Sequence, residues 1–350
     1  MILVYIMTID KEQLKEIKIT PLIDTLQLED ISDDEYFSER YKDRLSNSRI
    51  GLLKTKGAKA FFEGLKSEYN SSFELGTWLH ELFLQPESFV LVDDVHNKPT
   101  AKAGLVANYL YKGTGITPTD DEIKIASIAC NYYKDKLTPN RLADFKQRAE
   151  PYWRDRYIYE QAHPKRSNDK ERLYVDDKSY TILTKCLESL ANDKNIQKII
   201  KPVYVLEEPI NKNEKTILID IQVEIPEHEP VIYKWKSKLD NFIINKEENS
   251  ISVNDLKTTS RPAVDFDPTY YSYERELAIY SWLLKLCAKK FYELENPTIS
   301  GNFLVVSTIP EYNTCLYPMT PKLFNKGFKE FTYLLKTVAY LNVVKGYEFK

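Results

Sequence analysis

The stretch from residue 231 to residue 259, VIYKWKSKLDNFIINKEENSISVNDLKTT, contains two runs in which apolar and polar residues alternate. The first run covers 231–240 and the second covers 251–257, with the polar residues 247–250 between them. Alternation with a period of two is typical of strands that bury one face. The sequence therefore predicts two neighbouring antiparallel strands.

Other runs predict further strands and helices around this pair. Strand-like runs occur at 203–206, 217–223, 302–307 and 315–317, and the charged residues 212–214 suggest a turn between the first two. Helical spacing predicts helices that begin at Ser46 or Asn47 and that cover 74–84, 271–292 and 321–341, together with a helical layer at 120–200. Because helices precede a sheet and then close over it, we expect an α+β fold of the α/β/α kind. Its central sheet is expected to be mixed, largely antiparallel and flanked by helices.

The composition bounds the class of protein. A chain of 350 residues with 43% hydrophobic residues is long enough to bury a sizeable core. The four cysteines have no spacing typical of zinc or iron–sulfur sites, so we expect reduced thiols in the core. The apolar opening 1–7 is too short to span a membrane, and we expect a cytoplasmic protein without membrane association.

Charge is distributed unevenly along the chain. The formal net charge of -3 argues against a protein that coats nucleic acid by bulk charge alone. Residues 1–45 hold eleven acidic and six basic side chains, which predicts an acidic N-terminal appendage. Residues 134–172 hold eleven basic and seven acidic side chains. This excess would suit contacts with phosphate, although a solvated helix face is the favoured interpretation.

The two predicted strands of the opening stretch carry the residues with the clearest chemistry. Asp240 ends the first strand, and Asp255 and Lys257 project from the same face of the second, so two carboxylates and one ammonium converge. Phosphodiester hydrolysis needs a hard cation held by oxygen ligands, and the backbone carbonyl of Leu256 could add one. A lysine there could orient or deprotonate water and stabilise the phosphate. Asp-x-Lys alone is weak evidence, because exposed strands carry such ion pairs by chance.

Further elements occur in a recognisable order around this pair. Upstream, Gly76, His80, Pro86 and Glu87 lie on and after a predicted helix, and downstream Glu276 and Tyr280 share a helix face. With the segments 45–50, 236–240 and 255–259, these residues resemble the RecE-like exonucleases of the PD-(D/E)xK superfamily. More distantly they resemble lambda exonuclease and the RecB-type nuclease domains. The resemblance covers roughly residues 45–345.

The resemblance implies a restriction-endonuclease-like PD-(D/E)xK nuclease domain over 46–350 and a specific activity. It implies a phage-type, metal-dependent exodeoxyribonuclease that degrades linear double-stranded DNA from its ends, 5′-to-3′, for recombination beside a single-strand annealing recombinase. It also implies a ring-like homo-oligomer. The implied metal is Mg²⁺, which Mn²⁺ can replace, held by His80, Asp240, Asp255 and the carbonyl of Leu256. The implied catalytic residues are Lys257, Asp255, Asp240, His80, Glu276 and Tyr280.

One position departs from the family pattern, and several alternatives stay open. The family has glutamine where this chain has Glu276, and a glutamate cannot donate a hydrogen bond as an amide does. The same site would suit a nuclease of single strands, an endonuclease, or an inactive DNA-binding scaffold. His80 could also be an ordinary buried histidine. Lys234, Lys236 and Lys238 could meet phosphates or face solvent, and Tyr270, Tyr271 and Tyr273 could stack on unpaired bases or belong to the core.

Overall fold

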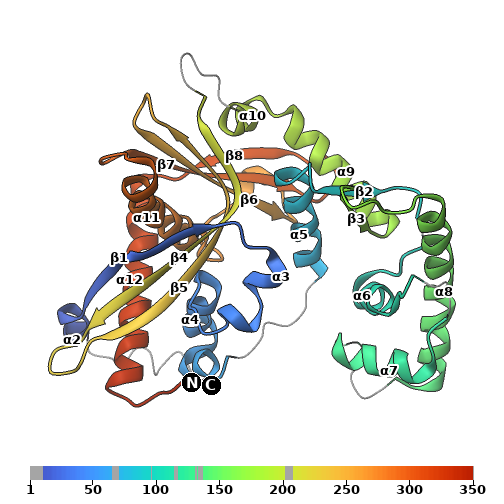
Figure 1. Ribbon diagram of the computed structural model, residues 1–350, viewed down its shortest axis with the longest axis horizontal. Coiled ribbons are helices and arrows are strands. Elements are labelled where there is room, and N and C mark those ends of the chain that lie inside the picture. Colours follow the sequence, from blue (N-terminus) through green and yellow to red (C-terminus); the bar gives the residue numbers. More distant parts are fainter. Residues whose placement is uncertain are drawn as a thin grey trace.

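A six-stranded sheet forms the centre of the molecule (Figure 1). The computed structural model describes residues 11–64, 71–95, 97–113, 117–130, 132, 137–201 and 208–349. The strands, in their order across the sheet, are β1 (Lys18–Glu29), β4 (Ile210–Glu224), β5 (Val231–Asn245), β6 (Ser250–Thr259), β7 (Thr298–Ser307) and β8 (Thr314–Pro318). β6 and β7 pair in parallel, and the other neighbours pair antiparallel. The predicted mixed, largely antiparallel sheet is confirmed.

The strands β5 and β6 separate partway along their length. Their ladder runs from Asn245↔Ser250 to Asn241↔Asn254. Beyond it, β5 continues beside β4, whereas β6 continues beside β7 as far as Thr259. Asp240 and Asp255 are the first residues past the end of the shared ladder, and we call this point the fork.

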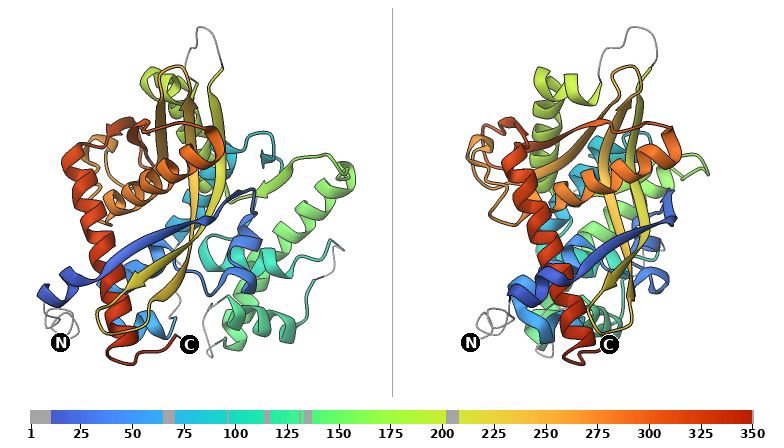
Figure 2. Two further views of the ribbon diagram at one scale, coloured as in Figure 1. Left: turned by 60° about the vertical axis from the view of Figure 1, so that its left-hand side comes forward. Right: turned by 90° about the vertical axis from the view of Figure 1, so that its left-hand side faces the viewer.

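Helices cover both faces of the sheet. On one face, α4 (Asn47–Phe62), α11 (Tyr273–Tyr292) and α12 (Pro321–Val343) pack into the largest core with apolar residues of β4 to β7. On the other, α5 (Ser71–Leu84), α9 (Asp177–Asn192) and α10 (Lys194–Ile200) pack on Leu256 and Leu304. Figure 2 shows α12, in red, lying across the sheet. The flanking helical layers are therefore confirmed, whereas the PD-(D/E)xK core stays a prediction.

A smaller group of elements stands to the side of the sheet in Figure 1 and has a core of its own. It contains the parallel pair β2 (Phe89–Val92) and β3 (Glu171–Tyr174) with α6 (Ala101–Leu110), α7 (Asp120–Ala129) and α8 (Pro139–Ala162). The helical layer predicted at 120–200 is thus divided, because α7 and α8 belong here whereas α9 and α10 cover the main sheet. Strand β3 was not predicted, since four residues are too few to show a period.

The N-terminal residues form part of the main sheet instead of a separate lead-in. β1 pairs with β4, and Leu14, Ile17 and Leu26 are buried in the largest core. After β1, the short helices α3 (Asp33–Tyr36) and η1 (Glu39–Tyr41) lead to Leu45, which bridges Trp235 on β5. The acidic residues of this segment alternate with buried apolar residues. A count of its charges therefore did not indicate that the apolar residues pack into the core. A domain boundary near residue 45 stays a prediction.

Most predicted element bounds lie close to the observed ones. Ser46 caps α4, because its Oγ accepts the N–H of Arg49 at 3.3 Å. The predicted turn at 212–214 is wrong, since β4 runs through these residues. The strand predicted at 203–206 lies outside the described residues. Within the described part of the chain, no helix is long and apolar enough to cross a membrane.

Candidate active site

The fork holds the carboxylate of Asp240 between two strands. The N–H of Leu256 points toward β5 and donates to Asp240 Oδ2 at 2.7 Å. Because β6 has left β5 at this point, a side-chain oxygen takes the place that a strand carbonyl would have. The backbone of β6 therefore fixes the carboxylate of Asp240, a predicted metal ligand on β5, at the point where the two strands diverge.

His80 reaches the fork from helix α5. Its Nε2 lies 2.9 Å from Asp240 Oδ2, and its Nδ1 donates to the carbonyl of Gly76 at 2.7 Å. Both ring nitrogens thus face oxygen atoms, and when Asp240 is ionised an imidazolium can donate to each of them. Burial alone would lower the pKa of His80, but the charge and hydrogen bond of Asp240 outweigh it and raise this pKa to about 9. Burial opposes ionisation of Asp240 too, and His80 nevertheless holds the pKa of that carboxyl below its usual value.

Lys257 lies at the centre of a second group of side chains. Its Nζ is 2.6 Å from Asp255 Oδ2 and 3.4 Å from Glu276 Oε2. Tyr280, one turn along α11, donates to Glu276 Oε1 at 2.9 Å. Burial disfavours the charged lysine, but these carboxylates raise the pKa of Lys257 well above its ordinary value. The pKa of Asp255, which is 1% exposed, is raised because burial outweighs the nearby ammonium.

All six predicted side chains therefore lie in two adjoining groups. His80 pairs with Asp240, while Asp255, Lys257, Glu276 and Tyr280 form a chain of contacts from β6 to α11. The charge of Asp240 contributes to the raised pKa of Lys257, so the two groups act on each other. The convergence of these residues is a property of the structure, whereas their chemical roles stay predictions.

The donor set fits a divalent cation only if its internal contacts rearrange. Among the described residues, no group of three or more His, Cys, Asp or Glu side chains forms a ready metal cluster. However, Oδ1 of Asp255 is buried and has no hydrogen-bond partner there. A buried oxygen without a donor is costly, and it is the kind of ligand that hard cations take. Ligation by His80 would further require loss of the proton that now faces Asp240.

Glu214 belongs to the site and was missed by sequence reasoning. It lies on β4 opposite Asp240, between the pairs Asn213↔Asn241 and Lys215↔Leu239. Its φ of 51° places it in the left-handed region, as expected for an irregularity in a strand. Burial and repulsion from Asp240 raise its pKa to about 7, although Lys238 lies 3.2 Å from its Oε2. The cluster of charged residues at 212–214 was the available signal, and it was interpreted as a turn.

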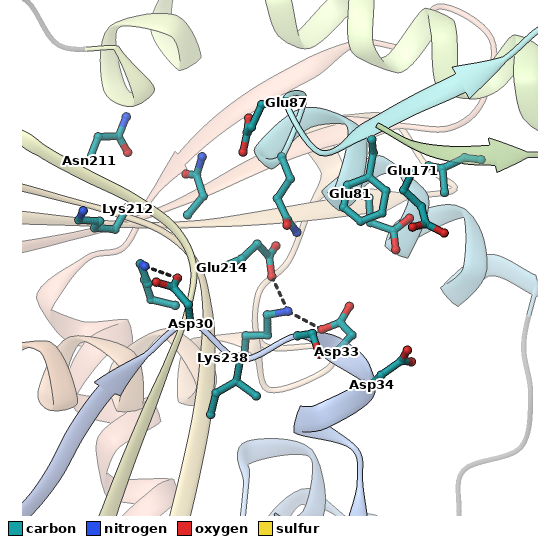
Figure 3. Close-up of a pocket in the computed structure, with 17 residues that line it drawn as sticks. Asp30, Asp33, Asp34, Glu81, Glu87, Glu171, Asn211, Lys212, Glu214 and Lys238 are labelled. Carbon is teal, nitrogen blue, oxygen red and sulfur yellow. Dashed lines mark hydrogen bonds and ion pairs between the residues drawn. The ribbon is translucent and has the colours of Figure 1, made fainter. Parts of the chain in front are cut away.

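An acidic cavity of about 770 Å³ opens beside Glu214 (Figure 3). Its lining contains three lysines and seven acidic residues, the latter being Asp30, Asp33, Asp34, Glu81, Glu87, Glu171 and Glu214. Burial, with repulsion from other carboxylates, raises the pKa of Glu81 to about 7. Such a concentration of negative charge repels phosphate. A nucleic-acid backbone is therefore expected to reach the fork from another side.

The lysines of β5 contact the N-terminal segment. Lys234 pairs with Asp43 at 2.9 Å, Lys236 donates to the carbonyl of Tyr36 at 2.6 Å, and Lys238 pairs with Asp33. These contacts favour a structural role over the predicted contact with phosphate.

The basic stretch 134–172 is similarly paired. Ion pairs join Lys146 to Asp120, Arg148 to Asp144, Arg154 to Asp155, and Arg156 to Glu160. Lys134 and Lys136 lie outside the described residues. The local excess of positive charge thus fits the interpretation of a solvated helix face better than a phosphate-binding surface.

No family model matches the chain, and no curated protein matches it. Among solved structures, the chain is similar to the crystal structure of a "putative exonuclease" from Eubacterium rectale. The two chains are 10% identical with a TM-score of 0.46, and the match covers 89% of this chain and 86% of the other. A similarity of this size carries no inference about activity, so the functional argument depends on the geometry of the fork.

Proposed function

We propose that this chain is a metal-dependent nuclease of the PD-(D/E)xK type that hydrolyses DNA phosphodiesters. The observation that supports this best is the fork. There, two carboxylates from diverging strands lie beside one lysine, and one of them has a buried oxygen without a hydrogen-bond partner among the described residues. A cation bound at the fork would pair with this oxygen, whose burial otherwise costs free energy.

Each residue of the fork has a role in this proposal. Asp255 and Asp240, with the carbonyl of Leu256 and with His80 once deprotonated, hold the divalent cation. A bound Mg²⁺ or Mn²⁺ supplies an activated water and neutralises charge on the phosphate. Lys257 would orient the attacking water and stabilise the negative charge that develops on the phosphate. Glu276 positions the ammonium of Lys257, and Tyr280 in turn holds Glu276.

The finer parts of the proposal come from the resemblance to RecE-like exonucleases. These are action on linear double-stranded DNA from its ends, 5′-to-3′ polarity, a role in recombination beside an annealing protein, and a homo-oligomeric state. Glu276 replaces the family glutamine, and in the structure it contacts both Lys257 and Tyr280.

The test is a digestion time course on end-labelled DNA with magnesium, manganese or a chelator. Linear duplex, circular duplex and single-stranded DNA serve as parallel substrates, so that exonuclease, endonuclease and single-strand activities are separated. We expect linear duplex to be degraded with either metal and to stay intact with the chelator.

Two lysine variants test the site itself. Lys257→Ala is expected to lose at least ~100-fold in rate, as for loss of one preorganised charge at a reacting centre. Lys285→Ala, a matched change at an exposed lysine of α11, should keep the wild-type rate. Full activity of Lys257→Ala, or digestion that continues in the chelator, would contradict the proposal.

A further inference from the structure

Two exposed tyrosines lie on the loop that joins the lysine strand to helix α11. Tyr270 and Tyr271 are 67% and 68% exposed. Neither belongs to the hydrophobic cores formed by the described residues, so their rings contribute little to the stability of the fold. Their position therefore requires another explanation.

A continuous series of rings connects these tyrosines to Lys257. The Nζ of Lys257 lies 4.9 Å from the ring centroid of Tyr273, which is half-buried. The Tyr271 ring is 5.5 Å from that of Tyr273, and the Tyr270 ring is 4.6 Å from that of Tyr271. The planes of the Tyr270 and Tyr271 rings meet edge to face at 86°, so these two rings are not stacked on each other. A strand whose phosphate lies at Lys257 would have this series of rings beside it.

The loop is held in a defined conformation. Tyr273 N–H donates to the carbonyl of Pro268 at 2.8 Å, and Tyr270 N–H donates to that of Asp267 at 3.2 Å. Ser272, between the two ends of the series, is buried in the left-handed region with φ of 58°, and Lys54 donates to its Oγ at 2.8 Å. A non-glycine residue adopts this conformation only at a cost in free energy, so the surrounding contacts must hold it there. The backbone that carries the rings is therefore preorganised, which lowers the entropic cost of binding.

The loop carries less negative charge than the acidic cavity on the other side of the fork. The guanidinium carbon of Arg261 lies 5.8 Å from the ring centroid of Tyr270, and both side chains are exposed. Asp265 and Asp267 are also on this loop, and Asp267 Oδ1 accepts the N–H of Thr269 at 2.8 Å. Among the described residues that line the acidic cavity beside Glu214, the one aromatic residue is Phe89, which is half-buried.

We propose that Tyr270 and Tyr271 form a stacking site for the unpaired bases of a DNA strand whose backbone reaches Lys257. This inference rests on the proposed nuclease function and names the form of DNA that the site engages. Aromatic rings stack on every base, so the site is expected to tolerate all sequences. The substrate at the fork would then be a frayed or single-stranded end, with Arg261 placed to meet its backbone or to stack beside Tyr270.

The experiment measures binding without cleavage, in chelator. The probe is a single-stranded oligodeoxynucleotide with a fluorescent adenine analogue, compared with an oligonucleotide of equal length and charge whose sugars lack bases at the same positions. Wild-type protein is expected to quench the analogue and to bind the strand with bases about ten-fold more tightly than the abasic strand. The Tyr270→Ala/Tyr271→Ala variant should lose both effects, while the Tyr270→Phe/Tyr271→Phe variant should keep them.

Tyr109→Ala provides the matched control, because Tyr109 is also 67% exposed but lies on α6. It should bind both strands as the wild type does. Equal affinity of the wild type for the two strands, or unchanged quenching in the double alanine variant, would overturn the inference. Light scattering measures the number of subunits in the same variants. If the alanine changes altered this number and left quenching intact, the rings would belong to a subunit contact and the inference would also be overturned. Digestion of linear DNA in magnesium is assayed separately, so failure of the nuclease proposal is distinguishable from failure of the stacking site.

Discussion

The two halves of strand β5, on either side of the Asp240–Asn241 bond, use buried polar groups in opposite ways. From Asn241 to Asn245 the strand has β4 on one side and β6 on the other. From Val231 to Asp240 it keeps β4, but the other side faces Leu45 and the fork. One step along the backbone separates a fully paired strand from the candidate site.

Amide side chains satisfy one another in the paired half. Asn241 Nδ2 donates to Oδ1 of Asn211 and of Asn213, both at 2.7 Å. Asn254 donates to Asn241 Oδ1 at 2.7 Å, and Asn302 donates to Asn254 Oδ1 at 3.0 Å. This ladder crosses four strands, β4 to β7, and we call it the amide ladder. Since each amide both donates and accepts, the ladder can be buried without a net charge.

The fork contains carboxylates in place of amides, and these are not all satisfied. Asp240 accepts from His80 and from Leu256, but Oδ1 of Asp255 has no hydrogen-bond partner among the described residues. The sheet is thus stabilised by paired amides on one side of Asp240, while the divergence of β5 and β6 leaves room for an unsatisfied carboxylate on the other. Asn241, which belongs to the paired amides, and Asp240, which belongs to the candidate site, are thus adjacent residues of one strand.

The largest expected effect comes from removing charge at the fork. Asp240→Asn should reduce the rate of DNA digestion by at least ~100-fold, because the variant lacks one negative oxygen ligand and the partner of the His80 imidazolium. Initial rates with magnesium measure this loss, and calorimetry in the same buffer should show weaker binding of Mn²⁺. Asp94→Asn, an isosteric change at an exposed aspartate, is the control and should retain the wild-type rate. Unchanged metal affinity of Asp240→Asn would place the cation elsewhere.

The pH dependence of stability tests whether Glu214 is buried beside the negative charge of Asp240. Burial and Asp240 raise its folded pKa to about 7, above the value of about 4.5 expected in the unfolded chain. Wild-type protein therefore holds a stabilising contribution below pH ~4.5 that is lost as pH rises toward ~7. The variant Glu214→Gln has no carboxyl at this position and does not undergo this loss. The free energy of unfolding of the variant minus that of the wild type should therefore rise by roughly 3 kcal/mol between pH ~4.5 and pH ~7, and should stay constant above pH ~7.

Thermal unfolding in chelator, followed by circular dichroism across this pH window, measures the difference. Glu227→Gln, at an exposed position, should keep the wild-type pH dependence. A Glu214→Gln curve that runs parallel to the wild-type curve would show that Glu214 is not held near the negative charge of Asp240.

Removal of a side chain from the amide ladder should lower the free energy of unfolding at all pH values. Asn254→Leu leaves Asn241 Oδ1 without its donor and Asn302 Nδ2 without one of its acceptors, in surroundings that exclude water. Each unsatisfied group costs about 1–3 kcal/mol, so we expect the free energy of unfolding in urea to fall by about 2–3 kcal/mol. Asn211→Leu, at the exposed end of the ladder, should cost less because water can replace the lost amide. Equal losses in the two variants would mean that the ladder does not act as a buried network.

Sequence reasoning could find the charged half of this comparison but not the amide half. Asp240, Asp255 and Lys257 stand in two strands with clear alternation, and His80 was found through its place in an ordered set of motifs. No pattern of period or spacing indicates that strands which pair at Asn241 diverge one residue later. The partners of the asparagines depend on the register of four strands, two of which are joined by a long helix. Such contacts are set by tertiary structure, which a local pattern does not contain.

The N-terminal segment shows the same limit in another way. Its acidic residues were visible in the sequence, and they predicted an appendage. In the structure, Asp33 and Asp43 pair with lysines of β5, whose positive charge lies about two hundred residues away in the chain. These two acidic residues therefore have their partners on β5, and a charge count over the N-terminal segment alone could not reveal this.

The smallest effect concerns the hydroxyl of Tyr280, which donates to Glu276 at 2.9 Å. Tyr280→Phe should lower the free energy of unfolding by about 1.5 kcal/mol, because a bond to a carboxylate contributes more than a bond between neutral groups. Tyr233→Phe is the matched control, since Tyr233 is also buried and donates to the amide oxygen of Asn342 at 3.0 Å. It should cost less than Tyr280→Phe in the same urea titration. Equal losses of stability in the two variants would mean that Glu276, the acceptor beside Lys257, behaves as a neutral group. The contrast between the charged fork and the neutral amide ladder would then not include α11.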